Sequence, residues 1–152
     1  TLTPDGKPDP AQVADLAGKL KNEFGGSTYA QYGSLFVAKV AVDTGKLDDA
    51  AAELKAIADK PTNPTLGEIA RQRLAQVLAA QNKADEALKL LDGDADKAFV
   101  ATREELTGDL LVQLGRTDEA NAAYQKAKAA LSDEAAVGGL QIKLDDLAKG
   151  DA

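Results

Sequence analysis

The sequence predicts an all-α protein built from repeated pairs of antiparallel helices, and three observations predict it. Alanine, leucine, lysine, glutamate and glutamine are abundant, and helices accommodate these residues at low entropic cost. Aromatic residues make up only 4% of the chain, and β-branched residues are sparse, which disfavours strands. Turn signals follow one another at regular spacing, as expected for short helices joined by short turns.

The regular spacing of the turn signals reflects an internal repeat. The segments 45–54, 82–91 and 115–124 align, and Ala50, Ala87 and Ala120 occupy one position in them, 37 and 33 residues apart. This spacing brackets the roughly 34-residue period of a tetratricopeptide repeat. A small residue is expected where paired helices cross closely, because a larger one costs about 1–3 kcal/mol. We therefore expect a right-handed tetratricopeptide-repeat (TPR) solenoid of about eight helices, with roughly three full repeats and capping helices.

The N-terminal part is predicted to be an extended lead-in followed by a capping helix. Residues 1–9 contain prolines and a glycine, and Asp9 is a plausible N-cap for a helix with Pro10 at its first position. Gly25 and Gly26 end this helix. Its apolar residues share one stripe that needs a partner: Val13, Leu16, Ala17, Leu20 and Phe24.

The rest of the chain is predicted to complete a single domain over residues 10–149. Ser27 caps a second helix that runs to about Asp43. The repeats cover approximately 31–64, 68–98 and 101–131, and a capping helix covers 133–149. The turn signals between these helices are Gly45, Pro61, Asn82, Asp92–Gly93, Gly115 and Ser132.

Packing positions within the repeats can also be predicted. The small position of the first helix holds Ala38, Ala75 and Gly108, and the large position of the second holds Leu54, Leu91 and Tyr124. In the last helix Leu140, Leu144 and Leu147 should face inward. Gly138 and Gly139 lie inside that helix and predict either a bend or a close approach to the preceding pair.

Charge and missing residue types exclude several functions. The net charge of −7 disfavours binding to nucleic acid or to an anionic membrane surface. The chain has no Cys and no His, which removes the common nucleophile, general base and metal ligands. We therefore expect no enzyme, no cofactor and no metal. With no Met and no apolar run long enough for a bilayer, the chain is expected to be part of a longer protein whose anchor precedes Thr1.

Two acidic patterns in the sequence have ordinary structural explanations. Asp92, Asp94 and Asp96 begin like a calcium loop, but Lys97 and Arg103 occupy the positions that need Gly and Glu. A solvated turn in which Asp94 or Asp96 caps the next helix explains them better. Adjacent acids in a helix point about 100° apart and do not converge, so these pairs are expected to lie on solvated faces: Asp48–Asp49, Glu104–Glu105 and Asp145–Asp146.

The strongest functional surface is the concave face, which the first helix of each repeat would form. Such a groove holds an extended segment or a helix of a protein partner. Packing between helix pairs is an equal alternative for Leu35 and Val112. Because Leu35 and Lys39 stand where a carboxylate clamp needs Lys and Asn, no clamp is expected. The candidate face consists of Tyr32, Leu35, Lys39, Gln72, Gln76, Glu105, Asp109 and Val112.

Four segments carry a resemblance to a known family. They are STYAQYGSLFVAKV (27–40), ARQRLAQVLAAQNKADEALKLLD (70–92), ELTGDLLVQLGRTDEANAAYQKA (105–127) and LQIKLDDL (140–147). With them the chain resembles the TPR-like periplasmic domain of the ancillary Sec translocon subunits, the YfgM-like family. The resemblance covers about residues 11–147.

The resemblance implies a single-pass bacterial inner-membrane protein with this domain in the periplasm. It implies a non-catalytic interaction module whose partners are Sec translocon subunits, a membrane-anchored prolyl isomerase and secreted clients, in a chaperone-like role. The repeats themselves equally permit a generic scaffold of another cell-envelope assembly, unrelated to secretion. The domain is expected to be a monomer or a weak homodimer, with the last helix as the contact.

Overall fold

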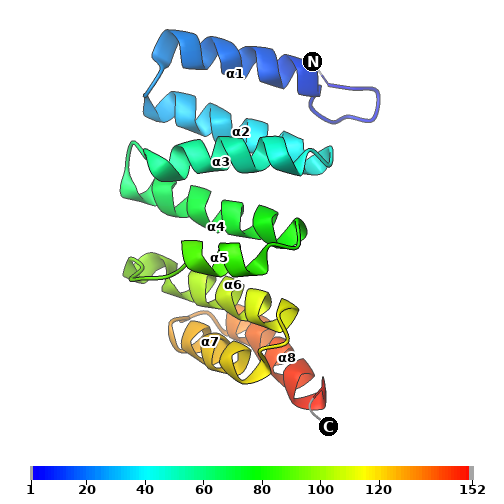
Figure 1. Ribbon diagram of the computed structural model, residues 1–152, viewed down its shortest axis with the longest axis vertical. Helices are drawn as coiled ribbons and strands as arrows, with labels where there is room; N and C mark the ends of the chain where they lie inside the picture. Colours follow the sequence, from blue (N-terminus) through cyan, green and yellow to red (C-terminus); the bar gives the residue numbers. More distant parts are fainter. Residues whose placement is uncertain (1, 151–152) are drawn as a thin grey trace. The chain divides into compact units, whose positions relative to one another are not determined.

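The computed structural model describes residues 2–150, and helices form most of them (Figure 1). Within this range there are eight α-helices and one short 3-10 helix, and the only β-pairing is an isolated bridge between Leu2 and Pro8. The prediction of an all-α protein is confirmed. The helices are α1 (Pro10–Phe24), α2 (Thr28–Asp43), α3 (Leu47–Asp59), α4 (Pro64–Ala80), α5 (Ala84–Leu90), η1 (Lys97–Phe99), α6 (Val100–Gln113), α7 (Thr117–Ala129) and α8 (Glu134–Gly150).

The chain divides into two compact units. Unit 1 is Thr1–Gln81 and contains α1 to α4, and unit 2 is Asn82–Ala152 and contains α5 to α8. Within unit 1, consecutive helices lie side by side, antiparallel and joined by short turns (Figure 1). The boundary between the units falls in the turn between the two helices of the second predicted repeat, so the single domain and the repeat limits stay predictions.

Local capping explains where the helices begin. The Asp9 side chain accepts a hydrogen bond from the Ala11 N–H, and Pro10 opens α1. The Ser27 hydroxyl accepts from the Ala30 N–H at the start of α2, as predicted. Asn63 caps α4 in the same way. Each cap satisfies an N–H group that has no partner inside its helix.

The repeated segments all start with a residue in the left-handed backbone region. Gly45, Asn82 and Gly115 have φ values of 75°, 61° and 71°. This conformation reverses the chain after the first helix of a pair, and glycine or asparagine adopts it most readily. The helices that follow lack a side-chain cap but carry two acidic residues in their first turn, where the helix dipole favours negative charge.

The core of unit 1 is built on small residues at the helix crossings. Ala50 is completely buried, as are Ala87 and Ala120 at the same repeat position in unit 2. The apolar stripe of α1 is only partly covered, because α1 packs mainly on a single neighbour, α2. Ala17 is buried, but Leu16 and Phe24 are exposed, so the partner that this stripe was expected to need covers only part of it.

The core of unit 2 joins α7 to α8. Leu140 and Leu144 are buried against Tyr124 and Ala127, and Leu147 is partly buried beside them, which confirms the inward face of the last helix. α8 is continuous through its two internal glycines. A Cβ atom at either of them would have no atom of the preceding helix pair within 4 Å, so of the two predicted alternatives the close approach is absent.

Candidate protein-binding groove

Unit 1 contains a cavity of about 330 Å³ between α2, α3 and α4. Its walls are mainly apolar, and its polar residues come from the first helices of two predicted repeats, α2 and α4. Two of these polar residues, Lys39 and Gln76, belong to the predicted concave face. The apolar lining is Ala38, Val42, Leu47, Leu54, Val77 and Ala80, and the polar lining is Lys39, Asp43, Arg73 and Gln76.

The two cations of this cavity differ in their partners. Lys39 Nζ lies 2.7 Å from Asp43 Oδ2, one helical turn further along α2, so these two charges neutralise each other. Arg73 on α4 is exposed and makes no hydrogen bond or ion pair with any residue of the described range 2–150. Its guanidinium is therefore available to a ligand at the edge of an apolar cavity.

An aromatic stripe, defined as Tyr29, Tyr32 and Phe36, lies on the exposed side of α2. These side chains are 76%, 56% and 46% exposed. Their spacing of three and four residues places them on one helix face, which continues to Lys39 at the cavity. They are half of the six aromatic residues of the chain. Clustered exposed apolar side chains are typical of interaction sites rather than of ordinary surface.

Unit 2 contains a second cavity, of about 390 Å³, beside a polar cluster formed by Glu105, Asp109, Tyr124 and Lys143. Lys143 Nζ on α8 lies 2.8 Å from Glu105 Oε1 and 2.7 Å from Asp109 Oδ1. The Tyr124 hydroxyl donates a 2.7 Å hydrogen bond to Asp109, and the Lys143 ammonium sits 5.5 Å from the centre of the tyrosine ring. Glu105 and Asp109 of α6 are therefore already engaged by side chains of α7 and α8.

This cluster predicts a loss of stability at alkaline pH. Burial and the hydrogen bond to Asp109 raise the pKa of Tyr124. Burial lowers the pKa of Lys143, but the hydrogen bonds to Asp109 and Glu105 outweigh it, so that this pKa is also raised. Groups whose pKa is raised by folding stabilise the protein below their unfolded values, about 10 for both residue types, and this contribution disappears as the pH rises further.

The expected result is a free energy of unfolding that falls above about pH 10. Urea unfolding between neutral and alkaline pH measures it, and Tyr124→Phe is the matched variant because it keeps the ring and removes the titrating hydroxyl. Its alkaline decline should be shallower than that of the unmodified chain. Equal declines in the two proteins would mean that the Tyr124 hydroxyl does not contribute.

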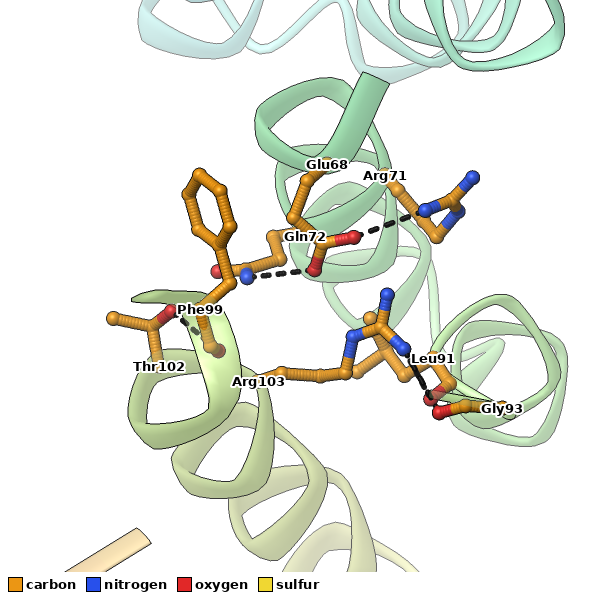
Figure 2. A network of polar contacts seen from close by, with 8 residues as sticks. All are labelled: Glu68, Arg71, Gln72, Leu91, Gly93, Phe99, Thr102 and Arg103. Atoms are coloured by element: carbon orange, nitrogen blue, oxygen red, sulfur yellow. Dashed lines mark hydrogen bonds and ion pairs between the residues drawn. The ribbon is translucent and has the colours of Figure 1, made fainter. Parts of the chain in front are cut away.

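Within residues 2–150, two charged side chains are buried, and both have structural hydrogen bonds (Figure 2). In unit 1, Glu68 accepts hydrogen bonds of 2.9 Å from both Arg71 and Gln72. In unit 2, Arg103 donates to the backbone carbonyl of Gly93 at 3.0 Å. A buried charge is tolerated only with such partners. The Gln72 side chain is therefore engaged with the Glu68 carboxylate in this structure.

The eight residues of the predicted concave face have different surroundings. Leu35 is only 6% exposed and belongs to the core, which is the packing alternative for this residue. Glu105 pairs with Lys143. The others are distributed as follows: Lys39 and Gln76 line the unit 1 cavity, Tyr32 belongs to the aromatic stripe, Gln72 contacts Glu68, and Asp109 and Val112 line the unit 2 cavity.

Sequence reasoning missed Tyr29, Phe36 and Arg73. The helical spacing of the three aromatic residues in a chain with only six was a signal that could have found the stripe. Nothing in the sequence separates Arg73 from Arg71, two residues earlier. Their difference comes from Glu68, which binds Arg71 on one face of α4 and leaves Arg73 on another.

The acidic turn 92–96 has the structural role preferred above. Asp96 accepts a hydrogen bond from the Ala98 N–H and caps η1, and Asp92 accepts one from the Gly93 N–H. In residues 2–150 no group of three or more carboxylates is placed to hold a metal ion. In the same range no helix combines the length and apolar character that crossing a bilayer requires.

Antiparallel helix pairs, small residues at their crossings and an apolar groove on the first helices define a TPR-type domain. The family model of the tetratricopeptide repeat-like domain matches residues 2–149. This match confirms the predicted fold class.

Two relatives align with this chain over most of its length. An "Ancillary SecYEG translocon subunit" of Escherichia coli is 30% identical over 148 residues, which are 97% of this chain and 69% of that protein. A protein of the same name from Neisseria gonorrhoeae is 30% identical over 131 residues, 85% of this chain and 62% of that protein. The chain belongs to the tetratricopeptide repeat-like family of ancillary SecYEG translocon subunits.

Proposed function

We propose that the chain is the non-catalytic, periplasmic interaction module of a membrane-anchored ancillary Sec translocon subunit. It binds translocon subunits, a membrane-anchored prolyl isomerase and translocating clients, to which it gives chaperone-like protection. The observation that carries this proposal is the groove of unit 1, defined as the aromatic stripe together with the adjoining cavity. The names of the two relatives, both ancillary SecYEG translocon subunits, support the assignment to a translocon assembly.

The physical properties of the groove suit a protein ligand. Its walls are apolar and its edge is polar, which is the usual composition of a recognition surface. Exposed tyrosines and phenylalanine provide a large contact area with few rotatable bonds. A helical scaffold supports both, so binding requires little rearrangement. In unit 2, Glu105 and Asp109 of the predicted face already pair with Lys143.

Photo-crosslinking in intact cells tests this proposal. A photoreactive amino acid replaces Phe36, Lys39 or Gln76 in the full-length protein, and the adducts are identified by mass spectrometry. The matched control replaces Lys55, which is exposed on α3 and does not line the cavity. Adducts with Sec channel subunits or the prolyl isomerase from the groove positions, and not from position 55, are the expected result.

The same experiment identifies the alternative. Adducts restricted to another envelope complex would replace the secretion role with that of a generic scaffold. Equal adducts from the groove positions and position 55 would show that the groove is not the binding surface.

A further inference from the structure

We propose that the groove of unit 1 binds an internal apolar segment of a partner protein and that Arg73 recognises one acidic side chain within that segment. This inference rests on the proposed function and adds the chemical class of the ligand. Three features of unit 1 carry it: the aromatic stripe, the apolar cavity beside it, and the unpartnered guanidinium at the cavity edge.

The length of the apolar surface requires a segment rather than a single side chain. Tyr29 and Lys39 are ten residues apart on one face of α2, which corresponds to about 15 Å along the helix. The cavity begins at Lys39 and extends toward α4. A ligand that covers both the stripe and the cavity must therefore be a segment of several residues.

The positive charge of Arg73 at the cavity edge favours a partner segment with an acidic side chain. Asp43 neutralises Lys39, so Arg73 is the cation of this cavity that lacks a partner in residues 2–150. A guanidinium pairs with a carboxylate through two parallel hydrogen bonds, and apolar surroundings strengthen them. The net charge of −7 repels acidic molecules in general, so a preference for an acidic ligand has to come from Arg73 itself.

A free C-terminal carboxylate is a less suitable ligand. Its recognition needs several donors around one group, and here the second cation of the cavity is already engaged with Asp43 at 2.7 Å. A single acidic side chain requires only the one guanidinium. The structure thus favours an Asp or Glu that lies among apolar residues of the partner.

Selection from a peptide library tests the inference. The probe is a set of random peptides about twelve residues long, enough for a helix of about 18 Å. Their C-termini are joined to the carrier, so that every peptide mimics an internal segment. The targets are the whole chain and its Arg73→Glu variant. The control is Lys89→Glu, which makes the same charge change at an exposed cation of α5 outside the groove.

We expect the unmodified chain and the Lys89→Glu variant to select apolar peptides with Asp or Glu at a constant position. Arg73→Glu should select Lys or Arg at that position instead, and its affinity for the acidic peptides should fall about tenfold or more. Arg73 is exposed, so the thermal unfolding of this variant should match that of the unmodified chain.

Several outcomes would overturn the inference. Apolar peptides without an acidic preference, a preference unchanged by Arg73→Glu, or no enriched peptide would each remove the role of Arg73. If peptides are enriched only when the same library is presented with free C-termini, the ligand of the groove is a terminal carboxylate. If sedimentation shows that the chain self-associates and that Arg73→Glu abolishes this association, a second copy of the chain occupies the groove. The crosslinking result reports on the proposed function separately, because it does not depend on an acidic residue in the partner.

Discussion

Replacing Leu140 with alanine is expected to lower the free energy of unfolding by about 2–5 kcal/mol, the largest effect predicted for this chain. The Leu140 side chain is 1% exposed and lies in the core cluster that joins α7 to α8, with Tyr124, Ala127 and Leu144. Truncation removes buried methyl groups and leaves a cavity that the rigid helices close only in part. Urea unfolding followed by circular dichroism measures the change.

The neighbouring Ile142 provides the matched control. It lies on the same helix, but its side chain is 64% exposed. Ile142→Ala should change the free energy of unfolding by no more than about 0.5 kcal/mol. If the two variants lose equal stability, α8 is not held by its Leu140 face.

Replacing Gly108 with alanine is the second large effect. A Cβ atom at this position would lie 2.3 Å from Tyr124 Cε1 and 2.4 Å from Cδ1, far closer than atoms can approach. The ring cannot move away easily, because its hydroxyl is bound to Asp109. The overlap outweighs the better helix propensity of alanine, so we expect a net loss of about 1–2 kcal/mol in thermal or urea unfolding.

Two further variants test whether the loss of stability at Gly108 comes from overlap with the Tyr124 ring. Gly138→Ala changes a helical glycine with no neighbour in reach, so it should stabilise the chain by about 0.5–1 kcal/mol. In a Tyr124→Leu background, Gly108→Ala should cost little, because the first two repeats hold alanine and leucine at these positions. If Gly108→Ala stabilises as Gly138→Ala does, the tyrosine ring is not fixed. A double-mutant cycle measures the coupling between Gly108 and Tyr124.

The helices and the repeat were predictable because local rules specify them. Asp9 and Ser27 cap their helices through side-chain hydrogen bonds to nearby N–H groups, which a short stretch of sequence reveals. Gly45 and Gly115 mark reversals because they adopt positive φ values. The alanines of the repeat are buried because close helix crossings require small residues. A partner covers the apolar stripe of α1 only in part. Periodicity shows which residues share a helix face but not how much of that face a neighbouring helix covers.

Some lining residues of the candidate groove could be named from the sequence, but the charges available there could not. Lys39 and Gln76, two residues of the predicted concave face, line the cavity of unit 1, and their role in binding stays a prediction. Lys39 is neutralised by Asp43, whereas Arg73 has no partner in residues 2–150. The sequence could not show this difference, because each of the two cations has an acidic residue near it in the sequence. Nor could it show that Leu35 is buried.

The sequence by itself determined the helical class, the repeat, the small residues at the crossings and the absence of cysteine and histidine. These properties follow from local conformational preference and from composition. Only the tertiary structure decided which charges are free. Lys143 reaches Asp109 across 34 positions of sequence and satisfies it, whereas no acidic side chain in residues 2–150 reaches Arg73. The physical reason is that ion pairs depend on distances of a few ångströms between helices remote in sequence, and helix packing sets those distances.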